Sequence, residues 1–310
     1  MRLITNESLR RPEVIRWHER IIQRYVPPEG IALAIILPCS ARKPYSKSRS
    51  HRKFIKHIKR GAKGKLPLVH EVIMTSPLGI VPRELENVYP AKHYDVPVTG
   101  HWTYEEKEIA IRLLKDYIQK ANARILAHVD GSYREICDSL HIPLTKENIL
   151  SAESLNDLES KIKKTLEDFE VSKTIKRRIG DLKRLCDFQF GRGSSEHLIS
   201  TNIRRKGYQI FSNDKQIASI NPQTGYLALS IKGGELLRGF GSYIVSLSFR
   251  PETNNIFSIG IRDADPQVRP GDEVIVEYDG KVVGVGKAIL NGNEMVRAIK
   301  GLAIVLRHRK

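Results

Sequence analysis

A short stretch of the sequence, residues 38–51 (PCSARKPYSKSRSH), carries a concentrated set of reactive side chains. It contains a thiol, several hydroxyls, a phenol, an imidazole and four cations, but no acid. A thiol becomes a nucleophile when a nearby cation or histidine lowers its pKa, and Lys43 and His51 are candidates for that effect on Cys39. The stretch therefore predicts attack on an electrophilic carbon beside an anionic ligand. The alternative is that Cys39 is a small buried side chain, since free cysteines are often buried.

The segments around this stretch predict how it is held. Residues 31–37 (IALAIIL) form an unbroken apolar run typical of a buried strand, and residues 47–65 have the thin apolar seam of a helix. Further strands are expected at 68–75 and 123–129, and further helices at 10–25, 103–121 and 133–140. This alternation predicts an α/β fold, with an N-terminal αβα domain built on a mostly parallel sheet.

Open α/β sheets bind ligands at the carboxyl ends of their strands. Three expected strands end in polar residues, at Cys39, at Ser76 and at Asp130. Because parallel strands end at one edge, we expect these residues to share a crevice. Asp130 could be a general base or could bind an amine, or it could belong to an ordinary Asp-Gly turn.

The charge of the chain indicates a polyanionic partner. It has 52 Lys and Arg against 35 Asp and Glu in 310 residues, a net charge of +17. Residues 47–65 hold nine basic residues and no acid, which favours phosphate contact over a merely solvated helix face. Three widely spaced cysteines without a CxxC pattern predict a reducing, cytoplasmic location and no metal site. No apolar run approaches the length of a membrane span or a signal peptide.

The remainder of the chain predicts two further domains. Residues 151–184 read as charged helices that link the domains, and short strands are expected at 208–211, 216–220 and 226–231. From about residue 242 the pattern is that of a small β-barrel, with hairpin turns expected at 270–272 and 278–280. The domain boundaries follow as 1–150 for the α/β core, 151–240 for the helical linker with a small α+β domain, and 241–310 for the barrel.

Three parts of the sequence resemble known families. The motif resembles the signature of archaeosine synthases at eight positions, namely Pro38, Cys39, Lys43, Pro44, Tyr45, Ser48, Ser50 and His51. Residues 241–310 resemble a PUA domain, the RNA-binding module of many RNA-modifying enzymes, and the preceding segment resembles the domain that comes before PUA in archaeal tRNA-guanine transglycosylases. Full-length relatives carry an additional transglycosylase-like domain ahead of the motif, so the chain is expected to be a split form.

The resemblance implies a tRNA-modifying enzyme of archaea. Such enzymes add an amine to the nitrile of 7-cyano-7-deazaguanine in the D-arm of tRNA. Free lysine or glutamine-derived ammonia is the expected donor, and no cofactor is expected. The implied partners are tRNA, a separate transglycosylase-like subunit and a radical-SAM enzyme that finishes the conversion, with no membrane. The alternative is a non-catalytic subunit that binds tRNA and presents it to a partner enzyme.

The candidate site residues fall into three groups. The expected catalytic residues are Cys39, Asp130 and His51. The expected substrate-binding residues are Ser40, Lys43, Tyr45, Ser48, Ser50, Ser76, Gly79, Arg83, Glu84 and Asp95. The expected RNA-binding residues are Lys47, Arg49, Arg52, Lys53, Lys56, Arg60, Arg204, Arg205, Lys206 and Arg269. Aromatic side chains of the segment that follows the second strand, including Trp102, are candidates to stack on an extruded base.

Overall fold

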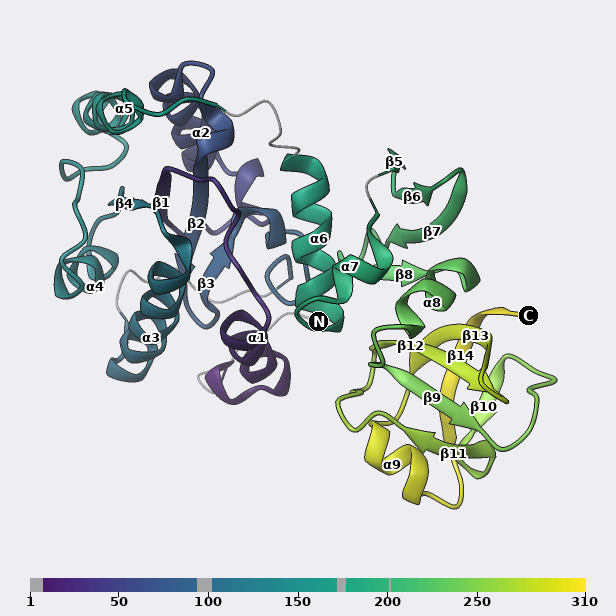
Figure 1. Ribbon diagram of the computed structural model, residues 1–310. Coiled ribbons are helices and arrows are strands. Elements are labelled where there is room, and N and C mark those ends of the chain that lie inside the picture. The colour runs from purple at the N-terminus through teal and green to yellow at the C-terminus, as the bar shows by residue number, and fades with distance from the viewer. Residues whose placement is uncertain (1–7, 94–101, 172–176, 201) are drawn as a thin grey trace. The chain divides into compact units, whose positions relative to one another are not determined.

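The structure of the chain is a computed structural model that describes residues 8–93, 102–171, 177–200 and 202–310 (Figure 1). The chain forms two compact units, residues 1–181 (unit 1) and residues 182–310 (unit 2). Within the described ranges, no helix combines the length and the apolar character that crossing a membrane requires.

Unit 1 is built on a four-stranded sheet with the order β3-β2-β1-β4. The strands are β1 (Leu33–Pro38), β2 (Val69–Thr75), β3 (Gly79–Pro82) and β4 (Arg124–Ala127). β1 is parallel to both β2 and β4, whereas β3 runs antiparallel to β2. The predicted mostly parallel α/β sheet is therefore confirmed. β3 was not among the predicted strands, because its four residues include a glycine, which weakens a strand, and a proline, which is found mainly in edge strands.

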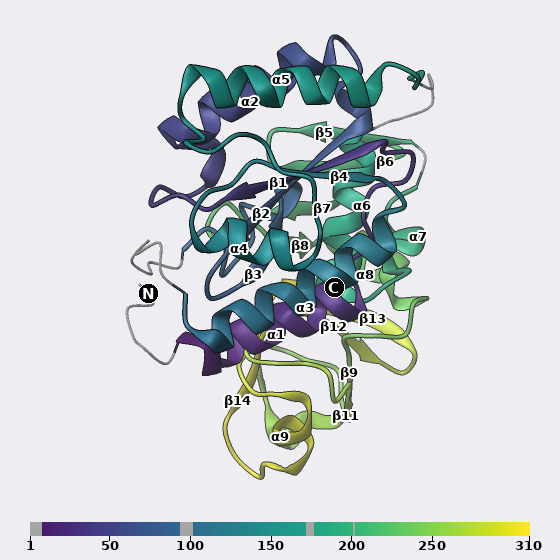
Figure 2. The same cartoon turned by 90° about the vertical axis from the view of Figure 1, so that its left-hand side faces the viewer.

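Helices cover both faces of this sheet (Figure 2). The bounds of the helices are α1 (Pro12–Gln23), α2 (Arg49–Ala62), α3 (Tyr104–Ala121), α4 (Ser132–Ser139) and α5 (Ala152–Leu166). α2 and α5 lie on one face, where Leu33, Ile35 and Leu37 of β1 join the core that they form. α1 and α3 lie on the opposite face, and the Trp17 indole of α1 donates a hydrogen bond to the Ile80 carbonyl oxygen of β3 at 3.1 Å. Because β1 ends at Pro38, the first residue of the motif, the motif is attached to the buried centre of unit 1.

α5 packs tightly on α2 within unit 1, although residues 151–184 were expected to link the domains. A Cβ atom placed on Gly61 of α2 would lie only 2.7 Å from the Glu159 carbonyl oxygen of α5. The absence of a side chain at Gly61 therefore lets the two helix backbones approach. The apolar face of α5, including Leu158 and Ile162, is fully buried. The high charge of the segment concealed this face because charged residues occupy the solvent side.

Unit 2 contains a small sheet with the order β5-β6-β7-β8. Its strands are β5 (Ile203–Lys206), β6 (Gln209–Ser212), β7 (Lys215–Ile220) and β8 (Leu227–Leu229). Its helices are α7 (Ser194–Leu198) and α8 (Ile231–Arg238), and α6 (Arg177–Phe190) spans the boundary between the two units. The predicted strands correspond to β6, β7 and β8. β5 was missed because three of its four residues are cations, a composition that is found on exposed edge strands.

A six-stranded sheet with the order β10-β14-β13-β12-β9-β11 completes unit 2. Its elements are β9 (Ile244–Leu247), β10 (Asn255–Phe257), β11 (Ile261–Ala264), β12 (Glu273–Tyr278), β13 (Lys281–Ala288), α9 (Gly292–Arg297) and β14 (Leu302–Arg309). Asp279 and Gly280 join β12 to β13 with φ values of 47° and 66°, as a two-residue hairpin turn requires. The hairpin predicted at 270–272 is wrong. β11 pairs with β9, not with β12, because turn residues do not encode the order of strands.

Candidate active site at the end of β1

Cys39 follows the last residue of the central strand β1. β1 lies between β2 and β4, and the parallel pairing places the carboxyl ends of all three strands at one edge of the sheet. The thiol is half-buried, whereas Cys137 and Cys186 are completely buried. Burial raises the pKa of each of those two thiols to about 12. Of the three cysteines, Cys39 is therefore the one that a reagent or substrate can reach.

A tyrosine lies directly against this thiol. The Cys39 Sγ atom and the Tyr133 Oη atom are 2.8 Å apart, and Tyr133 comes from the first turn of α4. The ring of Trp102 packs edge-on against Tyr133, with the ring centroids 5.0 Å apart. A thiol, a phenol and an indole thus meet at the carboxyl edge of the sheet. Sequence reasoning missed Tyr133, although its position directly after a polar strand exit is a signal that could have found it.

The Tyr133 hydroxyl keeps its proton at neutral pH. Burial is the main cause that raises the pKa of Tyr133, and the neighbouring charge of an ionised Cys39 raises it further. A hydrogen bond with Trp102 acts in the opposite direction and is the smaller effect. The phenol next to the thiol is therefore a proton donor, not a phenolate.

His51 is held in one orientation by both of its ring nitrogens. Its Nε2 atom is 2.9 Å from the Pro38 carbonyl oxygen, and its Nδ1 atom is 3.0 Å from Arg83 Nη2. A carbonyl only accepts and a guanidinium only donates, so Nε2 carries the proton and Nδ1 accepts. Burial, followed by the charge of Arg83, lowers the pKa of His51 to about 3. This neutral and fully buried imidazole fixes the motif to β1, a geometry that favours positioning over the predicted proton transfer.

Arg83 connects the motif to the neighbouring strand. Its guanidinium pairs with Glu71 of β2 at 2.6 Å and with Glu86 at 3.0 Å, and all three side chains are largely buried. Glu86 also accepts a hydrogen bond from the Ser46 backbone N–H of the motif at 2.9 Å. Arg83 was predicted to bind substrate. In the structure its guanidinium joins Glu71 of β2 to Glu86, which bonds to the motif.

The aromatic and hydroxyl side chains of the motif mostly stabilise its own fold. Tyr45 is completely buried and packs against His51, with Lys43 lying over its ring at 5.6 Å from the centroid. Ser48 caps α2 by accepting from the His51 backbone N–H at 3.1 Å, and its hydroxyl lies 3.2 Å from that of Ser50. Ser40 donates to the Arg42 carbonyl oxygen at 3.0 Å and stays partly exposed.

Asp130 occupies a different setting from Cys39. Its carboxylate accepts a hydrogen bond from the Ile149 backbone N–H at 2.9 Å. It also lines a cavity whose other lining residues are Gly131, Arg134, Glu135, Asp138, Glu147 and Asn148, none of which belongs to the motif. Asp130 therefore braces the segment after β4, and this cavity is acidic where the motif is basic.

The other predicted substrate ligands serve the packing of unit 1. Ser76 donates a hydrogen bond to Glu106 in the first turn of α3. A Cβ atom on Gly79 would collide with the Leu113 side chain of α3, so glycine lets β3 pack against α3. Glu84 accepts from Tyr25 and bonds to His70, each at 2.9 Å. Asp95, with Tyr94 and His101, lies outside the described residues.

The predicted RNA-binding residues form two kinds of surface. α2 and its entry carry a row of exposed cations, which we call the α2 basic face: Lys47, Arg49, Arg52, Lys53, Lys56, Lys59 and Arg60. In the described parts of the chain none of these seven pairs with a carboxylate. In unit 2, by contrast, Arg204 pairs with Asp214 at 3.1 Å, and Arg205 and Arg269 donate to carbonyl oxygens of their own loops. Lys206 is exposed.

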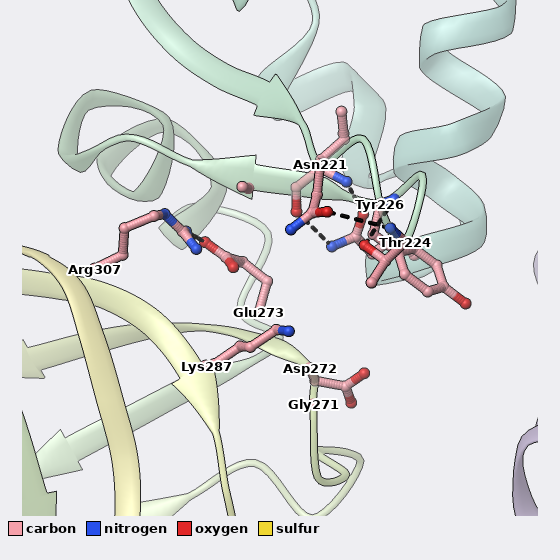
Figure 3. A pocket seen from close by; sticks show the side chains of 11 residues that line it. Asn221, Thr224, Tyr226, Gly271, Asp272, Glu273, Lys287 and Arg307 are labelled. Carbon is pink, nitrogen blue, oxygen red and sulfur yellow. Dashed lines mark hydrogen bonds and ion pairs between the residues drawn. The ribbon is translucent and has the colours of Figure 1, made fainter. Parts of the chain in front are cut away.

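Unit 2 has a cavity of its own between its two sheets (Figure 3). Glu273 of β12 lies there, paired with Arg307 of β14, and it accepts from the Leu229 backbone N–H of β8 at 2.8 Å. Burial raises the pKa of Glu273 to about 7, although Arg307 opposes this effect. The contacts of this carboxyl join the small sheet to the six-stranded sheet, which indicates a structural junction.

Three family models match successive parts of the chain. Residues 14–166 match DUF5591, a domain of unknown function, residues 181–243 match the patch-forming domain C2 of tRNA-guanine transglycosylase, and residues 251–309 match the PUA domain. The chain therefore joins an α/β unit with a half-buried thiol to a C2-type domain and a PUA domain. Unit 2 corresponds to the last two.

Individual relatives narrow this class. The chain is 42% identical to archaeosine synthase subunit alpha of Methanosarcina acetivorans and 38% identical to that of Thermococcus kodakarensis. Each alignment covers 99% of this chain but only 51% and 55% of the relative, so the chain spans about half their length. The crystal structure of AF0587, a protein of unknown function, matches 95% of this chain and 99% of its own with a TM-score of 0.72 and 27% identity. The chain is thus similar to archaeosine synthases over nearly its whole length, and the resemblance predicted from the motif is confirmed.

Proposed function

We propose that this chain adds an amine to the nitrile of 7-cyano-7-deazaguanine in tRNA. The observation that carries the proposal is the half-buried Cys39 thiol, which lies within the archaeosine synthase motif at the carboxyl edge of a parallel sheet. The names of the relatives supply the reaction class, and the motif supplies a nucleophile of the right type. Because the chain spans about half of those relatives, its own activity has to be measured.

The surroundings of Cys39 suit this substrate in two ways. Trp102 and Tyr133 provide flat, partly apolar surfaces beside the thiol, against which an extruded heterocyclic base can stack. The α2 basic face begins within the motif, at Lys47, and can hold the phosphates of the same RNA. The buried contacts of His51 and Arg83 keep the loop that carries Cys39 in a fixed conformation.

The nature of the amine is part of the proposal. Free lysine and glutamine-derived ammonia are the two donors that fit addition to a nitrile, and both give an amidine. The experiment therefore incubates the chain with tRNA that contains 7-cyano-7-deazaguanine, in separate reactions with lysine and with ammonium. Digestion of the tRNA and mass measurement of its nucleosides then identifies the donor by the mass that the modified base gains.

Two cysteine variants test the role of the thiol. We expect Cys39→Ala to slow the mass gain by at least about 1,000-fold, because the residual catalysis of an enzyme without its nucleophile is small. Cys137→Ala is the matched control, since it removes a buried thiol of the same unit and should leave the rate within a few-fold. Full activity of Cys39→Ala would show that the site is wrongly assigned.

The α2 basic face favours a second candidate function, that of a tRNA-binding subunit without catalysis. Its seven exposed cations would serve this function equally well, because phosphate contacts need no reactive group. The same incubation separates the two candidates. Tight binding of the nitrile-bearing tRNA with no mass gain from either amine would favour the binding subunit.

A further inference from the structure

We propose that Tyr133 is a catalytic residue that relays the proton from Cys39 to the nitrile nitrogen. This inference rests on the proposed function and assigns a role to a residue that the motif does not contain. The geometric basis is the 2.8 Å contact between Cys39 Sγ and Tyr133 Oη, which places one hydroxyl directly on the reacting atom.

Addition to a nitrile requires a proton as well as a nucleophile. The carbon accepts the sulfur, while the nitrogen gains an electron pair and must be protonated. The other groups predicted for proton transfer have partners of their own. Both ring nitrogens of His51 are bonded, and Asp130 accepts from the Ile149 N–H and lines a cavity whose lining residues do not include Cys39. Tyr133 is the titratable side chain that the structure places against the thiol.

The relay balances in atoms and electrons. The sulfur electron pair forms the S–C bond as one π bond of the nitrile breaks and its electron pair moves to nitrogen. Tyr133 gives its hydroxyl proton to that nitrogen and takes the thiol proton in return, so the six atoms S, C, N, H, O and H close a ring. The product is a thioimidate, which is the thiol S–H added across the C≡N bond, and Tyr133 is unchanged.

The same hydroxyl can serve the second half of the reaction. The amine nitrogen attacks the thioimidate carbon, the C–N bond forms, and the C–S bond breaks with its electron pair returning to sulfur. A proton from the amine passes through the Tyr133 oxygen to the departing sulfur. The amidine is released and the Cys39 thiol is restored, with no oxidant or reductant involved.

Two features of the structure suit Tyr133 to this role. It stays protonated at neutral pH, because burial raises the pKa of its hydroxyl. Its ring is fixed by the edge-on contact with Trp102 and by its place in the first turn of α4. A donor that is already oriented needs little rearrangement when the substrate binds.

The test compares two tyrosine variants that each lose one buried hydroxyl. Tyr133→Phe should slow the formation of the covalent protein–RNA adduct by about 100-fold or more with nitrile-bearing tRNA and no amine, while the Kd for tRNA stays within a few-fold. Tyr117→Phe is the control, because its hydroxyl contacts His70 instead of the thiol. Thermal unfolding of both variants shows whether each is folded.

A second substitution covers the case in which Tyr133→Phe does not fold. Replacing Tyr133 alone by 3-fluorotyrosine keeps the size of the ring but makes the phenol more acidic, so the adduct rate should change. A folded Tyr133→Phe variant with the wild-type adduct rate overturns the relay while the proposed function stands. If that variant does not fold, an unchanged adduct rate of the 3-fluorotyrosine protein overturns it. Failure of the wild-type chain to modify the nitrile in the presence of amine overturns the proposed function, and the relay with it.

Discussion

In unit 1 the strands β1 and β4 are neighbours in the sheet, and each leads through a polar segment into a helix. Each segment also contains a buried, neutral histidine that bonds to the main chain, His51 after β1 and His128 after β4. The segments differ in what remains free. After β1 the Cys39 thiol is half-buried and meets Tyr133, whereas after β4 the Asp130 carboxylate is bonded to Ile149.

The comparison teaches that residue type alone does not mark a reactive group. The Asp130 carboxylate, which was predicted as a general base, accepts a hydrogen bond that stabilises a loop, and its role as a base stays a prediction. The segment after β1 (the β1 exit) and the segment after β4 (the β4 exit) also differ in charge. The β1 exit continues into the α2 basic face, whereas the β4 exit borders an acidic cavity. Phosphates of an RNA should therefore approach the first exit and avoid the second.

The largest expected difference concerns the reactivity of the thiols. Iodoacetamide should modify Cys39 at least about 100-fold faster than Cys137 of α4, because burial raises the pKa of Cys137 to about 12 and leaves almost no thiolate. Mass measurement of peptides from a timed reaction checks this. Equal rates at the two cysteines would contradict the claim that the β1 exit holds the accessible thiol.

The Arg83 network should dominate the stability of the β1 exit. Arg83→Met leaves the carboxylates of Glu71 and Glu86 largely buried without their cation, which costs about 3 kcal/mol or more. Urea unfolding measures the loss. As a control, Arg204→Met removes an exposed ion pair and should cost less than about 1 kcal/mol.

The two histidines should make the unit sensitive to acid. Burial is the main cause that lowers the pKa of His51 to about 3 and of His128 to about 4. The unfolded chain binds protons near pH 6.5 while the folded chain does not, so the stabilisation is complete above pH 6.5 and is lost as the pH falls. Each histidine then costs about 2 kcal/mol between pH 7 and pH 5.

The variant His128→Gln should reduce this pH dependence by about the contribution of one histidine. Urea unfolding of the wild type and the variant at pH 7 and pH 5 provides the four free energies of unfolding that are needed. An identical pH dependence in both proteins would show that the histidine after β4 is not held neutral.

The difference in charge should appear in RNA binding. Lys53→Ala with Lys56→Ala removes two exposed cations from the α2 basic face, and we expect about a 10-fold loss of tRNA affinity at moderate salt. The slope of log K against log salt should fall by about 1.5. Arg204→Ala is the comparison variant, because this cation is already paired with Asp214. A larger effect of Arg204→Ala would place the main phosphate contacts in unit 2.

The smallest expected effect is that of Asp130→Asn. The amide oxygen can still accept from the Ile149 N–H, so the free energy of unfolding should change by less than about 1 kcal/mol. Nitrile addition should stay within about 3-fold of the wild type. A 1,000-fold loss of activity would restore Asp130 as a catalytic base and remove the contrast between the two exits.

Particular residues show how far sequence reasoning extends. The apolar run at 31–37 correctly predicted the central strand, and the Asp279-Gly280 pair correctly predicted a hairpin, because both signals are local. β3 and the packing of α5 on α2 were missed. An edge strand of four residues is too short to show a periodic pattern. The many charged residues of α5 obscured its apolar side, which packs closely on α2 at Gly61.

The α/β class, the PUA resemblance and the motif that carries Cys39 follow from the order of residues alone. Which polar side chains of unit 1 can act depends on contacts that form in folding. Tyr133 is 94 residues away from Cys39 along the chain. Arg83, which bonds to His51, lies in the short 3-10 helix η4 (Arg83–Leu85) that follows β3. The hydrogen-bond partners of a polar side chain come from distant parts of the sequence. A local pattern therefore cannot show which polar groups are bonded in the folded protein.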